Sequence, residues 1–411
     1  MSAAPRSAAA PTRQARYARA AVAAVFLTNG ALYANVVPRF PQLKADLDLS
    51  NTALGAAIAA MPLGALLAGL LAAAAIQRFR SSRVASIGIV LLAAAMFLVA
   101  FVPNGFALAA VMFTAGALDA VIDVAQNAHG LRVQRRYGRS IVNSFHGLWS
   151  IGAVLGGLMG SAAAGLDVPL TLHLGFSAVL FSAVAIVALR FMLPGPDGAD
   201  PAPATTDTGT ATAAPGTPGG KKWSGPAVRM LAVLGVLAAC GALVEDAGAS
   251  WGAIYLRDEL ATGAAAAGLA FVALQVAMTA GRLTGDRVVD RYGQRTVVRT
   301  GGILTAAGMG LALAFPSLGT TLAGFALAGL GVATLVPAAM HTADELPGLP
   351  PGLGLTVVSW LLRVGFLLSP PLVGLVADQS SLRVGLLTVV VAGVVTAIFA
   401  RVLVNRTEPA H

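Results

Sequence analysis

The sequence predicts an all-α polytopic membrane protein, with twelve transmembrane helices arranged as two six-helix pseudo-repeats around a central cavity. The first observation is composition: 57% of the 411 residues are hydrophobic and 11% are charged, too apolar for a soluble domain of this length. The second is that the apolar residues form long runs, each able to cross a bilayer. The third is an excess of small residues over aromatic ones, because small side chains let membrane helices approach closely.

Twelve apolar windows are long enough to cross the hydrocarbon layer, which is about 30 Å thick. The first six form an N-terminal bundle over residues 20–193, and they are expected at 20–38, 52–76, 84–102, 105–128, 141–165 and 169–193. The other six form a C-terminal bundle over residues 226–404, and they are expected at 226–256, 262–283, 297–315, 319–341, 353–377 and 382–404. Residues 1–19 and 405–411 are then the two tails.

Between the bundles, residues 194–225 are rich in Pro, Gly, Thr and Ala. Such a composition provides neither an apolar helical face nor enough side chains for a core. We expect a disordered linker there. Six spans on either side of it place the N-terminus, the linker and the C-terminus on one side of the membrane.

The basic residues predict the orientation. With the N-terminus on the first side, that side holds 22 of the 27 lysines and arginines, including a short turn expected between the fourth and fifth spans with Arg132, Arg135, Arg136 and Arg139. The positive-inside rule makes this side the cytoplasm. We therefore expect a protein of the cell membrane with both termini cytoplasmic. The net charge of +9 then reflects topology and contact with anionic lipids, with no nucleic-acid partner.

Two short basic turns occupy matching places in the two halves. The connection after the second span reads AIQRFRSSRV, and the one after the eighth reads VVDRYGQRTVV. Residues 77–79 of the first half occupy the position that corresponds to residues 290–292 of the second half. Parallel six-helix repeats produce this kind of correspondence.

The segment GDRVVDRYGQR, residues 285–295, resembles the cytoplasmic loop signature of the major facilitator superfamily. That signature is a glycine, three residues, Asp-Arg, one residue, a second glycine and two basic residues. Asp286 stands at the first glycine, and the first-half copy has Gln77 and Arg80 where aspartate and glycine are expected. The resemblance implies a transporter that works by alternating access, with a cytoplasmic gating loop of Asp286, Arg287, Asp290, Arg291, Gly293 and Arg295.

Within the superfamily, the sequence is most similar to the fucose-permease branch of sugar/proton symporters. The similarity lies in GALDAVIDVAQN, NSFHGLWSIGA, GRLTGDRVVDRYG and PPLVGLVAD. In that branch the acid of the fourth helix is a protonation site, and Asp119 stands at the matching position. His146 replaces the usual glutamine of the fifth helix, and Ala34 stands where the first helix has an acid.

Three titratable residues within or near apolar runs are candidates for proton coupling: Asp119, Asp123 and His146. The two aspartates are four residues apart, so a helix places them on one face. Two close carboxylates in low dielectric cannot both ionise cheaply, and one is expected to hold a proton. Histidine is the side chain that ordinarily changes charge near neutral pH. The alternatives are an ion pair of Asp123 with a loop arginine and a purely local role for His146.

The second half offers Glu245 and Asp246 in the seventh span, Trp251 as an aromatic wall, and Arg363 about ten residues into its span. We expect Arg363 to have a partner there, either one of these acids in an ion pair or a bound ligand. Uncharged polar residues form interhelical hydrogen bonds or line the cavity. The full set of cavity candidates is Asn29, Gln126, Asn143, Glu245, Asp246, Trp251, Gln275 and Arg363.

Two further patterns concern packing. Gly152, Gly156 and Gly160 form a ridge of small residues that predicts a close helix contact. The segment 152–157 partly resembles the antiporter signature of the superfamily's fifth helix, with Ala153 in place of its proline. The lone Cys240 excludes an intrachain disulfide framework.

The sequence contains no phosphate-binding loop, His-Glu-x-x-His motif or paired-cysteine site, so neither an enzyme nor a bound cofactor or metal is expected. The expected function is proton-coupled transport of a small solute, such as a sugar or a related polar compound, by a monomer. The alternative is proton-coupled efflux of a drug or secondary metabolite, favoured by the Ala- and Gly-rich walls and by Ala34. A membrane sensor would need a soluble signalling domain.

Overall fold

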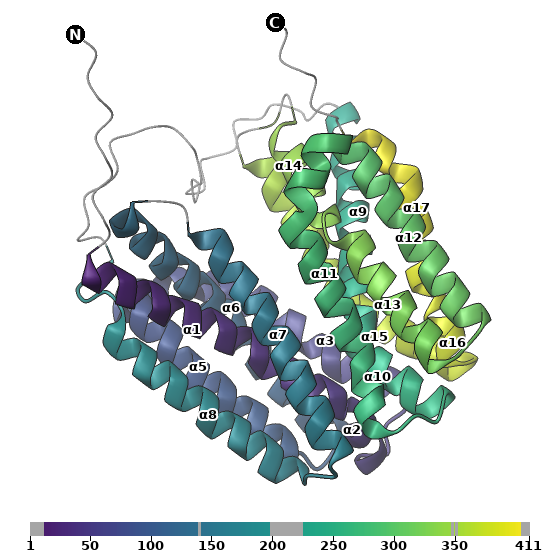
Figure 1. The fold of residues 1–411 in the computed structure, drawn as a ribbon, viewed down its shortest axis with the longest axis horizontal. Coiled ribbons are helices and arrows are strands. Elements are labelled where there is room, and N and C mark those ends of the chain that lie inside the picture. The colour runs from purple at the N-terminus through teal and green to yellow at the C-terminus, as the bar shows by residue number, and fades with distance from the viewer. Residues whose placement is uncertain (1–11, 139–140, 198–224, 347–348, 350–351, 404–411) are drawn as a thin grey trace, which may run out of the picture.

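The computed structural model describes residues 12–138, 141–197, 225–346, 349 and 352–403. Twelve of its helical segments are long and apolar enough to cross a membrane, at the places expected from the sequence. They form two bundles that lie side by side, purple to teal and green to yellow in Figure 1. The predicted fold class is confirmed.

The N-terminal half contains α1 (Arg13–Val36), α2 (Phe40–Asp46), α3 (Asn51–Ala68), α4 (Ala72–Phe79), α5 (Ser81–Leu98), α6 (Gly105–Tyr137), α7 (Val142–Gly165) and α8 (Leu170–Phe191). The C-terminal half contains α9 (Gly225–Ser250), α10 (Gly252–Ile254), α11 (Ala264–Tyr292), α12 (Gln294–Ala314), α13 (Leu318–Val332), α14 (Leu335–Asp344), α15 (Leu353–Gln379), α16 (Leu382–Gly385) and α17 (Leu387–Phe399). A π-helix, Tyr255–Glu259, follows α10.

We call the end of the molecule where α1 begins, α8 ends and α9 begins the linker end. The opposite end, which carries α2 and the π-helix, is the far end.

The glycine ridge of α7 packs directly on the backbone of α1. A Cβ atom at Gly152, Gly156 or Gly160 would overlap the carbonyl oxygen of Leu27, Ala31 or Asn35, respectively. Gly30 of α1 faces the backbone of α7 in the same way. The close helix contact that the sequence predicted is confirmed, and it occurs between the first and fifth spans.

Helix α6 is longer than expected and changes the assignment of the arginines after the fourth span. It has 33 residues, about 50 Å at 1.5 Å per residue, and it ends only at Tyr137. Arg132, Arg135 and Arg136 therefore lie on a helix and not in a turn. Arg132 is 1% exposed, so it belongs to the interior. Arg139 lies outside the described residues.

The two basic turns have the same backbone conformation, which supports the internal repeat. Gly293 ends α11 with φ 81° and ψ 147°, and Arg80 ends α4 with φ 74° and ψ 144°. Each backbone N–H donates over 2.8 Å to the carbonyl four residues earlier, in Val289 and Ile76, respectively. Glycine adopts this conformation freely, whereas a side chain at positive φ is strained.

Replacing Arg80 with glycine is expected to stabilise the protein by about 1 kcal/mol, because it removes this strain. Thermal unfolding of the purified protein measures the change as a higher midpoint. Arg78→Gly is the matched control: it places glycine within α4, and it should destabilise by about 1 kcal/mol. A lower midpoint for Arg80→Gly would contradict the strained conformation.

Candidate functional site

The strongest candidate, Asp119, lies in α6 beside α1. Its Oδ1 accepts a hydrogen bond of 2.8 Å from Nδ2 of Asn29, whose Oδ1 accepts one of 2.9 Å from the indole N–H of Trp149. Asn29 thus joins the first, fourth and fifth spans. Gly116, one turn before Asp119, packs against the backbone of Met61 in α3, so the helix that carries the carboxylate is held closely in place.

Asp123 and His146 form a second group closer to the linker end. Asn127 connects them: its Nδ2 donates over 3.0 Å to Oδ1 of Asp123, and its Oδ1 lies 3.2 Å from Nε2 of His146. Since that amide oxygen can only accept, Nε2 is the donor. The His146 ring contacts Phe26 edge-on, with 5.3 Å between ring centroids. Both Asp123 and His146 are exposed, so this group is open to water.

Two other N-terminal candidates have different surroundings. Gln126 is 1% exposed, its Nε2 donates to Asp123 over 3.3 Å, and its Oε1 has no partner. Asn143 is exposed in the first turn of α7.

The two acids of the seventh span, Glu245 and Asp246, contact different partners. Glu245 lies 3.3 Å from the guanidinium of Arg282 in α11. Asp246 accepts a hydrogen bond of 2.7 Å from Ser250, one turn further along α9. Neither acid pairs with Arg363 in the described part of the chain. The exposed Arg363 reaches from α15 towards Gly69, with a guanidinium nitrogen 3.6 Å from the position of a Cβ there.

The remaining C-terminal cavity candidates are buried. Trp251 is fully enclosed where α9 ends, so it packs in the core and offers no wall to a ligand in this conformation. Gln275 is 2% exposed on α11, and its Nε2 has no partner.

The residues of the predicted gating loop lie at the linker end. Asp286, Arg287, Asp290 and Arg291 are exposed in the last turns of α11, and Gly293 forms the turn into α12. Arg295 donates through Nε to the carbonyl of Leu403 over 3.0 Å, which ties the loop to the end of the last span.

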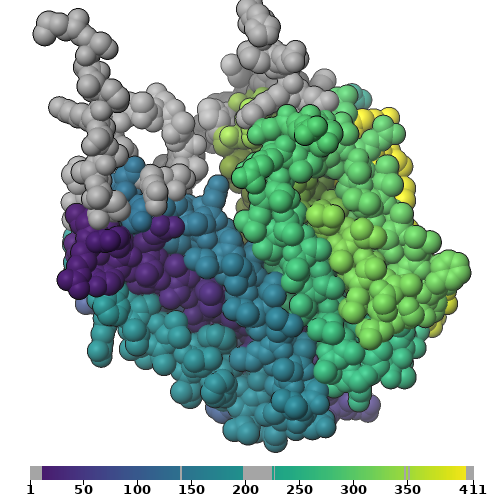
Figure 2. All heavy atoms as spheres, in the orientation of Figure 1, coloured from purple at the N-terminus to yellow at the C-terminus, as the bar shows by residue number. Residues whose placement is uncertain are grey.

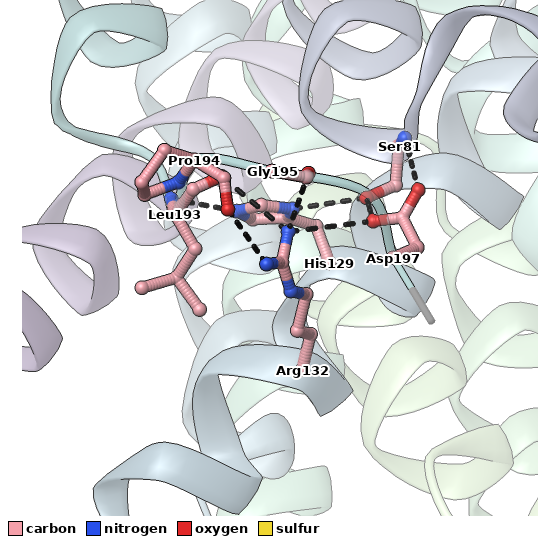
Figure 3. Close-up of polar contacts among 7 residues, drawn as sticks. All are labelled: Ser81, His129, Arg132, Leu193, Pro194, Gly195 and Asp197. Atoms are coloured by element: carbon pink, nitrogen blue, oxygen red, sulfur yellow. Dashed lines mark hydrogen bonds and ion pairs between the residues drawn. The ribbon is translucent and has the colours of Figure 1, made fainter. Parts of the chain in front are cut away.

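A polar cluster that the sequence did not reveal holds the first residues after α8 (Figure 3). The Arg132 guanidinium donates to the Pro194 carbonyl over 2.7 Å and to that of Gly195 over 3.2 Å. Asp197 accepts from the backbone N–H of Ser81 over 2.8 Å, at the start of α5. Residues 194–197, which we expected in the linker, are therefore fixed to the N-terminal half. Residues 198–224 lie outside the described part.

His129 at the centre of this cluster has a defined tautomer. The Leu193 backbone N–H donates to its Nε2 over 3.2 Å, so that nitrogen accepts. Its Nδ1 lies 2.9 Å from Oγ of Ser81, and the Ser81 hydroxyl donates to Asp197. Each group in this chain therefore donates to the next one: the Leu193 N–H to the neutral His129 imidazole, His129 to the Ser81 hydroxyl, and Ser81 to the Asp197 carboxylate (Figure 3).

Polar contacts join the two halves at the far end. Oδ1 and Oδ2 of Asp378, at the end of α15, accept from the first two backbone N–H groups of α3, of Asn51 over 2.9 Å and of Thr52 over 2.7 Å. Lys44 of α2 lies 2.7 Å from Asp258 in the π-helix. A carboxylate at a helix N-terminus is doubly favourable, because it satisfies free N–H groups and faces the positive end of the helix dipole.

Small residues bring the same helices together. Gly55 of α3 faces the Pro370 carbonyl, and Gly374 of α15 faces that of Asn51. On the other seam, Gly157 of α7 receives the ring of Phe271 from α11. Figure 2 shows the two lobes in contact towards the far end and separated by a notch towards the linker end. The space between the halves is thus closed at the far end.

Twelve candidate spans in two similar halves that meet at the far end define a multi-pass membrane protein with the architecture of a transporter. Residues 231–411 match the model of the Major Facilitator Superfamily. The chain is 31% identical over 378 residues to the membrane protein MosC of Rhizobium meliloti, covering 92% of this chain and 88% of MosC. It therefore belongs to the major facilitator superfamily.

Two further proteins resemble this chain, one in sequence and one in fold. The uncharacterized transporter y4wD of Sinorhizobium fredii is 28% identical over 389 residues, covering 93% of this chain and 97% of that protein. The fold is similar to a bacterial homologue of the human lysosomal transporter Spinster in an inward-facing, unoccupied conformation, with a TM-score of 0.73, 14% identity and coverage of 97% and 100%. The resemblance to the fucose-permease branch stays a prediction.

Sequence reasoning missed several of these residues. Trp149 follows His146 by one turn, so an indole on the same helix face was a signal for it. Asp378 ends an apolar span, where a charge is ordinary, and only the structure shows its contact with α3. His129 gave no signal beyond its position near the arginines.

Proposed function

We propose that this protein is a secondary transporter that couples the movement of a small polar solute, such as a sugar, to protons by alternating access. The main observation behind this proposal is a hydrogen bond between the first and fourth spans. Nδ2 of Asn29 donates to Oδ1 of Asp119 over 2.8 Å. A carboxylate at this depth, held by a single amide, is a reversible proton site whose access can change with conformation.

Asp119, Asn29 and Trp149 act as one unit in this mechanism. The ionised Asp119 accepts from the Asn29 amide, whose oxygen is already engaged by Trp149. Protonation removes the negative charge and weakens the hydrogen bond from Asn29 to Asp119. The position of the Trp149 indole N–H therefore depends, through Asn29, on the protonation state of Asp119. The face of the indole ring provides an apolar surface on which a sugar ring can pack.

The group of Asp123, Asn127 and His146 is the proposed proton path to the linker end. Asn127 contacts both titratable side chains, and both are exposed. Protons can pass from Asp119 through water to these exposed groups when the notch at the linker end is open. By the positive-inside rule this end faces the cytoplasm, in contact with anionic lipids.

Replacing Asp119 with asparagine is expected to abolish solute accumulation driven by a pH gradient, a loss of at least about tenfold, because the amide cannot carry a proton across. A panel of sugars and related polyols is first screened by thermal stabilisation of the purified protein. Uptake of the stabilising compound is then measured in proteoliposomes with an imposed pH gradient, and exchange without a gradient is measured in parallel.

The matched control is Asp123→Asn, which leaves Asp119 and its Asn29 contact in place and should slow uptake by only a few-fold. If Asp119→Asn still accumulated solute with the gradient, the coupling role would be lost. Lower drug accumulation in cells that make the protein, without uptake of any sugar, would assign efflux instead.

A further inference from the structure

Asp246 is a buried carboxyl group with half of its hydrogen-bonding capacity unused. It lies one turn before the end of α9 and is 8% exposed. Its Oδ1 accepts from the Ser250 hydroxyl over 2.7 Å, whereas its Oδ2 has no partner. An ionised oxygen without a donor in a low-dielectric interior is costly, by several kcal/mol on general grounds.

A second unused group lies beside it. Ser369 of α15 is 1% exposed, its Oγ has no hydrogen-bond partner, and it lies beside the Asp246 carboxyl group. A proton on Oδ2 would remove the negative charge and convert that oxygen into a donor, with Ser369 Oγ beside it as an acceptor. One proton therefore removes the buried charge and gives Oδ2 a neighbour with which to form a hydrogen bond.

The other titratable groups near Asp246 do not supply a counter-charge. Glu245, its neighbour in sequence, is acidic, and Arg282 of α11 is engaged with Glu245 at 3.3 Å. Tyr33 of α1 faces Asp246 from the opposite half. Arg363 of α15 is exposed and lies near Gly69, after the end of α3. Asp246 thus has no counter-charge among these groups, and it lies at the boundary between the halves.

We propose that Asp246 is a second proton-binding site of the transport cycle, in the opposite half from Asp119. The proposal rests on the transport function proposed above. When the far end opens, the helices that enclose Asp246 separate from Tyr33, and water reaches the carboxylate. A hydronium ion then transfers one proton to Oδ2 and leaves a water molecule.

The enclosure explains how this proton would be coupled to the conformational change. Closing the far end over an ionised Asp246 would bury a charge that no neighbouring cation balances. Closure over the neutral acid buries no charge. The protein therefore returns to the closed state with the proton bound, and it releases that proton only after the surroundings of Asp246 change again.

Infrared spectroscopy tests this directly, with the proton as the probe. The purified full-length protein in lipid nanodiscs is titrated around neutral pH without any solute, and the carbonyl stretch of protonated carboxyl groups is recorded. Asp246→Asn is expected to remove one component of this band. Ser369→Ala is expected to keep that component at a higher frequency, because the acceptor of its hydrogen bond is lost. Asp344→Asn, which changes an exposed carboxylate at the end of α14, should leave the band unchanged.

An unchanged band in folded Asp246→Asn, or an unshifted band in Ser369→Ala, would overturn the inference. The outcome is independent of the proposed function. If the Asp246 component is present but no solute is accumulated, the second proton site stands and the transport proposal fails. If Asp246→Asn accumulates solute in response to pH as well as the unchanged protein does, the second site fails and transport stands.

Discussion

Valine at Gly156 is expected to prevent the N-terminal half from folding. The position of its Cβ overlaps the Ala31 carbonyl oxygen, and a helix backbone cannot move aside as a flexible side chain can. Separating α7 from α1 would also loosen the neighbouring contacts of Gly152 and Gly160 along the same ridge. We expect a destabilisation of at least about 3 kcal/mol, at the upper limit of ordinary overpacking.

The measurement is the yield of monodisperse protein after extraction from membranes, together with its thermal unfolding midpoint. Gly147→Ala is the matched control on the same helix. The Cβ of that alanine would meet the Leu283 side chain at 3.9 Å, an ordinary contact, so yield and midpoint should stay within error of the unchanged protein. Normal yield and stability for Gly156→Val would show that α1 and α7 do not pack at backbone distance.

Alanine at Asp378 is expected to shift the protein towards states with an open far end by about tenfold. The substitution removes two charge-assisted hydrogen bonds to the N-terminus of α3. Such bonds contribute about 1.5–3 kcal/mol each when buried. Asp378 is exposed, so we expect about 1.4 kcal/mol in total, which corresponds to that tenfold shift.

Lys44→Ala serves as the comparison, because it breaks the ion pair with Asp258, which also joins the halves at the far end. Lys44 and Asp258 have side chains 20% and 42% exposed, and exposed ion pairs contribute little, so we expect at most about a twofold shift. The two variants thus separate a helix-capping carboxylate from a surface ion pair at the same end of the molecule.

Distances between spin labels measure both shifts. In a Cys240→Ser background, Phe106→Cys and Gly319→Cys place one label on the far end of each half, at exposed positions. Asp378→Ala should enlarge the population at long distance, and Lys44→Ala should change it slightly. Equal distributions for Asp378→Ala and the unchanged background would refute the stabilising role of Asp378.

The fold could be predicted because each span carries its own signal. Length and hydropathy identify a helix without its neighbours, and Gly152, Gly156 and Gly160 identify a packing face. Helix ends were less predictable: α6 continues through Arg132, because charged residues continue a helix once it leaves the hydrocarbon layer. The positive φ of Arg80 follows from its equivalence with Gly293, which the repeat already indicated.

The sequence predicted residues of the candidate site, but it did not predict which of them form hydrogen bonds or ion pairs with one another. Asp119 stood out as an acid in an apolar run, but its partner Asn29 is 90 positions away. Arg363 has no acidic partner in the described structure, because Glu245 pairs with Arg282 instead. Trp251 is enclosed where α9 ends, a consequence of a helix break that hydropathy alone does not locate. The partner and the burial of a side chain depend on how its helix is rotated and how deep it lies in the bundle. Helix packing determines both, and they cannot be read from a single sequence.

The contrast between the two glycine contacts of α7 has a mechanical consequence. Within the N-terminal half, α1 and α7 touch backbone to backbone, with no layer of side chains that could change rotamers. Such a contact is stiff, because a close-packed backbone interface has few neighbouring minima. Between the halves, α3 and α15 also touch backbone to backbone, at Gly55 and Gly374, whereas on the α7–α11 seam Gly157 receives the ring of Phe271, which can change its rotamer. Deformation should therefore concentrate at the α7–α11 seam, so that each half moves as a rigid body and its internal geometry is preserved.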